Sequence, residues 1–150
     1  MSDYGGLLAI SATGLQAERL RLEVAAQNLA NAHSVVGSQG EPYRSLRVIP
    51  HASATGVFEE QLATGKDAIA ELRGVDHIDV LPTGGEPRLD YDPGNPLADS
   101  KGMVRMPQIN VSDEMLTVLS SVRAYETDIR AMNAAKSIAL KALDIGSSRA

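Results

Sequence analysis

All seven prolines of this 150-residue chain lie between Pro42 and Pro107, so both ends of the sequence lack the residue that most strongly breaks helices. Nine of the thirteen glycines lie between Gly37 and Gly102. The sequence therefore predicts two helical ends that bracket a turn-rich middle. Charge follows the same division, because residues 33–113 carry twelve acidic and seven basic side chains.

The N-terminal end carries a leucine at every seventh position. Small alanines lie three or four residues from these leucines and would let a second helix approach closely. A seven-residue repeat is typical of helices that wrap around one another. The seam is narrow, because the charged residues Glu18 and Arg19 interrupt the second row of apolar side chains that would run beside the leucines. The predicted seam residues here are Leu8, Leu15, Leu22 and Leu29.

The C-terminal end carries a longer heptad pattern, broken only at Lys136. Ser112 and Asp113 are suitable cap residues before it, and Gly146 is placed to end it. The apolar and aromatic seam positions predicted to mediate assembly are Met115, Val118, Val122, Tyr125, Ile129, Met132 and Leu143.

Both helices have an apolar stripe, and the middle offers no third helix of comparable length. We therefore expect the two ends to pair with each other, with copies of themselves, or with both. The alternative from periodicity alone is a two-helix layer that covers one face of a small sheet. The predicted fold class is α+β, with residues 1–35 and 111–150 forming one coiled-coil module and residues 36–110 forming a β-rich module.

The middle predicts short strands over residues 43–49, 75–81, 88–91 and 102–106, the first of them ended by Pro50. Residues 52–73 are ambiguous. Phe58, Leu62, Ile69 and Leu72 are compatible with an amphipathic helix broken at Gly65, or with loop and strand.

Composition excludes several classes of function. A net charge of −5 and an aromatic content of 3% disfavour a nucleic-acid partner, which needs a basic surface and stacking rings. The absence of cysteine excludes disulfides and thiolate chemistry. No run approaches the roughly 18 consecutive apolar residues that a transmembrane helix needs, so the sequence predicts no membrane-spanning helix. A cleavable signal peptide also fits poorly, because Asp3 lies near the start and the first basic residue is Arg19.

Enzymatic function has little support. The three histidines look isolated in the sequence, and no phosphate-binding or nucleophile motif occurs. His77 could bind a metal with Asp76 and Asp79, but alternation along a strand points Asp76 away from the other two, so a solvated strand face is favoured. Paired acids such as Glu59 with Glu60, or Asp90 with Asp92, favour a solvated surface over a hydrolase. We expect no catalytic residue, no cofactor and no metal site.

Two stretches combine residues that constrain the backbone or form specific hydrogen bonds. Asn28 and Asn31 bracket Leu29 at the end of the first helical region, where Asn31 could simply cap the helix. The functional hypothesis is that both asparagines bond to neighbouring chains and fix their register. In residues 89–99, Pro93 and Pro96 stiffen the backbone, which predicts a connector between sheet and helix or a rigid linker between modules.

These stretches resemble the axial proteins of the bacterial flagellum: rod, hook and hook-associated proteins. Asn28-Leu-Ala-Asn31 is similar to the signature of that family. The remaining matches, which are closest to proximal-rod members, are Gly40-Glu-Pro-Tyr-Arg44, Tyr91-Asp-Pro-Gly-Asn-Pro-Leu-Ala-Asp99, Lys101-Gly-Met-Val-Arg-Met-Pro107, Ser121-Val-Arg-Ala-Tyr-Glu126, Ala135-Lys-Ser137 and Leu140-Lys-Ala-Leu143. The signature positions are Asn28, Asn31, Tyr43, Tyr91, Pro93 and Pro96.

The similarity covers residues 5–52 and 74–146. The chain departs from the family pattern in three places: Gln27 replaces a common serine, Met103 replaces an aromatic, and Ser53–Arg73 is expanded.

The resemblance implies a structural subunit of the rod, the drive shaft that crosses the periplasm, carries torque and encloses the export channel. It implies export through the flagellar type III apparatus without a cleavable signal. The implied partners are copies of the chain, other rod proteins, membrane-ring and export-gate adaptor proteins at the rod base, and the periplasmic bushing ring. The alternatives are another flagellar axial protein, a cytoplasmic coiled-coil adaptor, and a small hydrolase built on acids such as Asp90.

Overall fold

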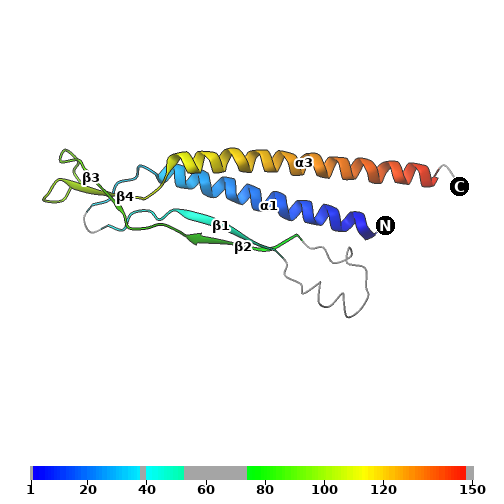
Figure 1. The fold of residues 1–150 in the computed structure, drawn as a ribbon, viewed down its shortest axis with the longest axis horizontal. Coiled ribbons are helices and arrows are strands. Elements are labelled where there is room, and N and C mark those ends of the chain that lie inside the picture. The colour runs from blue at the N-terminus through cyan, green and yellow to red at the C-terminus, as the bar shows by residue number, and fades with distance from the viewer. Residues whose placement is uncertain (1, 38–39, 53–73, 148–150) are drawn as a thin grey trace, which may run out of the picture. The chain divides into compact units, whose positions relative to one another are not determined.

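The computed structural model describes residues 2–37, 40–52 and 74–147. Along the described residues, one helix precedes and one helix follows four short strands, so the predicted α+β class is confirmed (Figure 1). The segment 53–73, which the sequence left ambiguous, lies outside the described residues. The elements are α1 (Ser2–Asn31), β1 (Leu46–Ala52), β2 (Val75–Pro82), β3 (Arg88–Tyr91), β4 (Met103–Met106) and α3 (Val111–Ser147).

The chain divides into two compact units, and each unit takes a part of both helices. The first comprises Met1–Arg19, Pro50–Asp79 and Val122–Ala150, and the second comprises Leu20–Ile49 and Val80–Ser121. The division into a coiled-coil module and a β-rich module stays a prediction about the assembled protein. Neither α1 nor α3 is long and apolar enough over its described residues to cross a membrane.

Small side chains form the buried face of α1. Ala17 is buried in the first unit, and Val24, Ala25 and Ala32 are buried in the second. In the first unit, a Cβ added to Gly14 would lie only 3.3 Å from the Asp128 carboxylate of α3. The two helices therefore approach closely at that point, which small residues allow.

α3 begins after Asn110, whose side-chain oxygen accepts hydrogen bonds from the backbone N–H groups of Ser112 at 3.0 Å and Asp113 at 3.4 Å. The prediction that Ser112 or Asp113 is the cap is therefore wrong by two or three residues. Asp113 and Glu114 instead occupy the first turn, where their negative charge is favourable beside the positive end of the helix dipole. Gly146 does not stop the helix, which runs to Ser147.

Two two-stranded sheets form the middle of the chain, one from β1 and β2 and the other from β3 and β4. β3 and β4 pair antiparallel, from Arg88 opposite Met106 to Tyr91 opposite Met103. Val104 and Met106 of β4 are buried, whereas all of β3 is exposed. The predictions of β2, β3 and β4 are confirmed to within a residue.

The prediction that Pro50 ends the first strand is wrong, because Pro50 lies inside β1. A two-stranded sheet leaves one edge of each strand unpaired. Proline has no N–H group to donate, so a strand with an unpaired edge can accommodate a residue such as Pro50.

The stretch predicted as a connector between sheet and helix, or as a linker between modules, is instead the loop of the β3–β4 hairpin. The Asp92 N–H donates to the Gly102 carbonyl at 2.9 Å, which closes the loop. Inside it, the Asp99 carboxylate accepts from the backbone N–H groups of Lys101 at 2.8 Å and Met103 at 2.9 Å. These two bonds hold the pKa of Asp99 below its usual value, because they favour the charged carboxylate. Pro93 and Pro96 therefore stiffen a hairpin loop.

Gly102 tests this loop, because its φ is +75° and a Cβ there would lie 2.9 Å from Cε2 of Tyr91. We expect Gly102→Ala to destabilise the fold by about 1–2 kcal/mol, the cost of a left-handed conformation for a residue with a Cβ. Gly94→Ala in the same loop is the matched control, since its Cβ would meet nothing closer than 3.7 Å. Urea unfolding of both variants measures the difference, and equal stabilities would contradict this account.

Candidate assembly surfaces

Asn28 joins the last turns of α1 to the start of β1. Its side chain is 1% exposed, and its amide pairs with both backbone groups of Leu46. Nδ2 donates to the Leu46 carbonyl at 2.9 Å, and Oδ1 accepts from the Leu46 N–H at 2.9 Å. The Tyr43 hydroxyl donates to the same Oδ1 at 2.9 Å. The Asn28 amide thus pairs with Leu46 as a neighbouring peptide group would.

The hypothesis that Asn28 bonds to a neighbouring chain stays a prediction, and within this chain the side chain already has several partners. Both acceptor positions of Oδ1 and one Nδ2 donor are used inside the chain, and the side chain is buried. The sequence singled out the right residue, but its partner lies 18 positions further along the same chain.

Asn31 serves as the local end of α1. Its Nδ2 donates to the Gln27 carbonyl at 2.9 Å, and its own carbonyl accepts from both the backbone N–H and the hydroxyl of Ser34. The capping interpretation of Asn31 is therefore confirmed.

Tyr43 lies half-buried beside this network. Burial raises the pKa of Tyr43 above its ordinary value, and the Glu114 carboxylate raises it further by repelling the phenolate. The protonated hydroxyl is also the form that can donate to Asn28. The neutral tyrosine is therefore the form that the folded chain favours.

The remaining signature residues lie on the exposed hairpin of β3 and β4. Tyr91 is 68% exposed, and Pro93 and Pro96 are exposed in the loop. Leu89 and Leu97 are exposed as well. The hairpin thus presents apolar and aromatic side chains to solvent, the feature that marks a contact surface when such residues cluster.

The four heptad leucines of α1 do not form its buried face. Leu8, Leu15, Leu22 and Leu29 are all half-buried. They flank the fully buried positions Ala17, Val24, Ala25, Asn28 and Ala32.

The predicted seam of α3 is partly exposed, since Val122, Tyr125 and Ile129 are 36%, 37% and 37% exposed. Met115, Val122, Tyr125, Ile129 and Leu143 are exposed, and Val118 and Met132 are half-buried. The most buried residue of the helix is Ser121, at 1% exposure, and its hydroxyl has no hydrogen-bond partner among the described residues. A role for these seam residues in contacts between chains stays a prediction.

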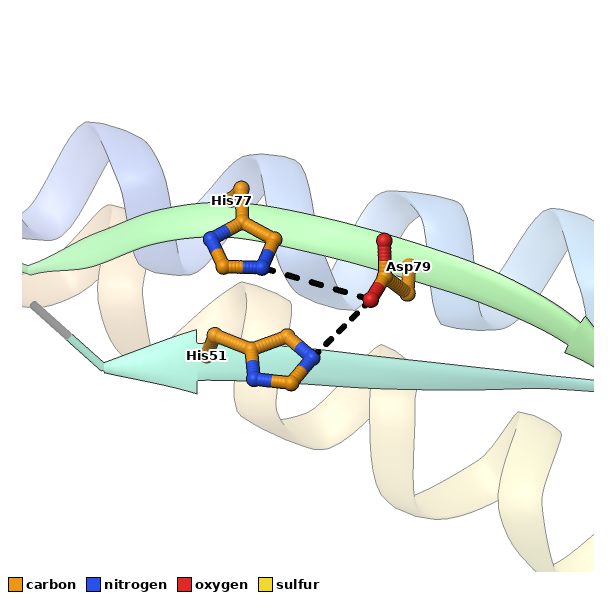
Figure 2. A group of neighbouring side chains, drawn as sticks. All are labelled: His51, His77 and Asp79. Atoms are coloured by element: carbon orange, nitrogen blue, oxygen red, sulfur yellow. Dashed lines mark hydrogen bonds and ion pairs between the residues drawn. The ribbon is translucent and has the colours of Figure 1, made fainter.

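Two histidines that looked isolated in the sequence lie together. His51 of β1 stacks on His77 of β2, with ring centroids 4.2 Å apart and planes 7° from parallel (Figure 2). Asp79 lies beside both rings, and Asp76, which alternation should point away, lies 3.5 Å from Nδ1 of His77. The sequence missed this cluster because nothing in it shows that residues 51 and 77 face each other across paired strands.

Asp90 is exposed on β3, 3.9 Å from the Arg88 guanidinium, as an ordinary surface ion pair. Glu59 and Glu60 lie outside the described residues.

No protein-family model matches the chain. Individual proteins do match over nearly its whole length. The flagellar basal-body rod protein FlgC of Escherichia coli O6:H1 is 42% identical over 137 residues, which cover 91% of this chain and 93% of that protein. The protein of the same name from Salmonella typhimurium is 40% identical with the same coverage. That of Bacillus subtilis is 34% identical over 146 residues, which cover 93% of this chain and 95% of that protein.

The chain belongs to the FlgC family. This membership confirms the resemblance seen in the motifs and the prediction of a structural subunit of the flagellar basal-body rod. FlgC proteins are structural flagellar proteins, in agreement with the weak case for an enzyme.

The bond from Asn28 to Leu46 can be tested in this FlgC chain by substitution. Asn28→Ala leaves the partly buried N–H and carbonyl of Leu46 without this partner, and we expect a loss of about 1–3 kcal/mol. Asn31→Ala removes an exposed cap and should cost less than about 0.5 kcal/mol. Urea denaturation of the two variants gives both values. If the two substitutions cost the same, Asn28 does not hold α1 to β1.

Tyr43 predicts a dependence of stability on alkaline pH. Because its folded pKa is raised, its stabilising effect is complete below the unfolded value, about pH 10, and is lost as the pH rises through the folded value. Tyr43→Phe should therefore show a shallower fall in unfolding free energy than the unmodified chain above about pH 9. The control is Tyr91→Phe, whose side chain is largely exposed. A Tyr43→Phe profile that parallels the unmodified one would refute the interpretation.

Proposed function

We propose that this chain polymerises through its two terminal helices, with copies of itself and with other rod proteins, into the drive shaft that carries torque across the periplasm and encloses the export channel. The proposal combines FlgC-family membership with one structural observation. That observation is the distribution of apolar side chains on α3.

Many large apolar side chains of α3 stay exposed in the single chain. The side chains that it buries or half-buries include small and polar ones, among them Thr117, Ser121, Ala124, Asp128 and Ala135. Its exposed large apolar residues are Met115, Leu116, Leu119, Val122, Tyr125, Ile129, Ile138, Leu140, Leu143 and Ile145. Soluble monomers rarely leave so extended an apolar surface uncovered, since burial returns about 25 cal/mol per Å².

The exposed residues include a row of apolar side chains at seven-residue spacing, interrupted only at Lys136. Met115, Val122 and Ile129 are seven residues apart, Lys136 follows at the next interval, and Leu143 continues the line. Side chains at this spacing insert between those of a partner helix when the two supercoil. The heptad leucines of α1 are half-buried, so they retain surface for the same kind of contact. This pattern supports coiled-coil packing between chains.

The β3–β4 hairpin suits the other contacts. Its exposed Leu89, Tyr91 and Leu97 lie on a short, stiffened element that a neighbouring protein could cover. We assign to this surface the contacts with adjacent subunits and the bushing ring. The rod-base contacts with membrane-ring and export-gate adaptor proteins belong to the same proposal.

A chain of this kind suits export in an unfolded state through the type III apparatus. α1 contains Gly5, Gly6 and Gly14, each of which costs a helix about 1 kcal/mol relative to alanine. Such a helix is marginal by itself and gains most of its stability from packing. Folding would thus be completed by assembly in the periplasmic rod, where newly buried apolar surface offsets the ordering entropy.

A cytoplasmic coiled-coil adaptor would use the same helices. It predicts a stable soluble dimer and a cellular function that does not depend on flagellar export. A strain that lacks only this chain distinguishes the two hypotheses, because loss of the rod above the membrane ring in electron micrographs of basal bodies is expected only for a rod subunit.

The seam itself is tested by Ile129→Asp. The residue is 37% exposed, so we expect the purified variant to remain folded. In cells it should fail to enter the rod and should abolish swimming, because a charge would be buried between helices. Leu22→Asp tests the leucine line of α1 in the same way.

The matched control is Thr127→Asp, which adds the same charge two residues away on a different side of α3. Its hydroxyl bonds only to the Arg123 carbonyl of the same helix. Motility should survive in this control. Normal motility with Ile129→Asp would rule out the α3 seam.

A further inference from the structure

We propose that His51, His77 and Asp79 form a binding site for one divalent transition-metal ion of the Zn²⁺ type. The three side chains come from two strands, His51 from β1 and His77 and Asp79 from β2. His77 and Asp79 are two residues apart and therefore point to the same face of β2. Figure 2 shows Nε2 of both histidines directed toward the same carboxylate oxygen.

The distances match those of a metal-binding group. Nε2 of His51 lies 3.1 Å from Oδ2 of Asp79, and Nε2 of His77 lies 4.0 Å from the same oxygen. One ligand atom from each residue lies within 4.8 Å of the others. Ligands held about 2.0–2.2 Å from a tetrahedral Zn²⁺ lie about 3.4 Å from one another. Small side-chain rotations bring the three atoms to that separation.

The ligand types select the class of metal. Two imidazoles and one carboxylate suit Zn²⁺, Co²⁺, Ni²⁺ and Fe²⁺, and they suit Mg²⁺ and Ca²⁺ poorly, because those ions prefer oxygen ligands. The side chains of His51, His77 and Asp79 are 42%, 58% and 47% exposed. An ion can therefore reach them from solvent, and water can complete its coordination.

Asp76 supplies the outer partner that metal-binding histidines usually have. Its carboxylate lies 3.5 Å from Nδ1 of His77. This contact favours a proton on Nδ1, and a proton there leaves the lone pair of Nε2 free on the side of Asp79. A carboxylate that orients a ligating imidazole in this way raises its basicity toward the metal.

The charge of the cluster also suits a cation. Two imidazoles 4.2 Å apart beside two carboxylates concentrate titratable groups on one strand face. A divalent cation would balance the carboxylates, and rotation of the two rings out of their parallel stack would direct both Nε2 lone pairs at it. The ion would then cross-link β1 to β2, which stabilises the strand pair.

The test is a titration of the purified full-length chain with ZnCl₂ by isothermal calorimetry, with MgCl₂ as the second titrant. We expect one equivalent of Zn²⁺ to bind and to raise the unfolding midpoint, and MgCl₂ at the same concentration to do neither. His51→Gln, His77→Gln and Asp79→Asn should each weaken Zn²⁺ binding by about 10- to 100-fold or more, since loss of an outer-shell partner alone has an effect of that size.

His33→Gln is the matched control, because His33 is exposed and lies outside the cluster. It should bind Zn²⁺ as the unmodified chain does. The absence of a stoichiometric site in the unmodified chain would overturn the proposal, as would unchanged binding in His51→Gln and His77→Gln.

A second measurement needs no substitution at the site. In NMR spectra of the unmodified chain, Zn²⁺ should shift the ring signals of His51 and His77 and leave those of His33 in place. Equal shifts at all three histidines would mean non-specific binding and would overturn the proposal even if a variant failed to fold. None of these outcomes depends on incorporation into the rod.

Discussion

The contact between the Asn28 amide and the backbone of Leu46 fixes how the first helix meets the first strand. A buried polar group that satisfies two backbone groups at once is expensive to lose, because each would otherwise be desolvated without a partner. Tyr43 completes the same network and brings the loop before β1 against the helix. The Asn-Leu-Ala-Asn stretch is therefore an intrachain fastening in this structure, and a role in register between chains would have to act through the surface that it organises.

The two helices differ in which side chains they bury within the chain. α1 is held within the chain by Asn28 and by small buried residues such as Ala25. α3 packs with a mixed, partly polar face and leaves many of its large apolar side chains exposed. Much apolar surface of the described residues stays exposed, and in the proposed assembly the burial of that surface would favour association through the hydrophobic effect. A structural protein needs this combination if it is to remain unassembled until it meets its neighbours.

The sequence predicted well what depends on local chemistry. Proline-free ends gave the helices, and alternation with turn residues gave β2, β3 and β4 almost to the residue. It failed where a residue's environment depends on distant parts of the chain. Pro50 stays within β1 because that strand has a free edge, which the sequence does not show. The partners of Asn28 and the stacking of His51 on His77 join residues 18 and 26 positions apart, and only strand pairing and helix docking bring them together.

The heptad residues show that a periodic apolar pattern does not by itself tell whether its side chains are buried within one chain. Periodicity identified Met115, Val122 and Ile129 as a seam, and the chain alone leaves that seam exposed. Within one chain, such a stripe would be an error of folding, because apolar positions normally face the core. In the rod assembly that we propose, the same stripe would contact another subunit. Under that proposal, the periodicity includes side chains that become buried only on assembly, whereas the single-chain structure shows those that folding alone buries.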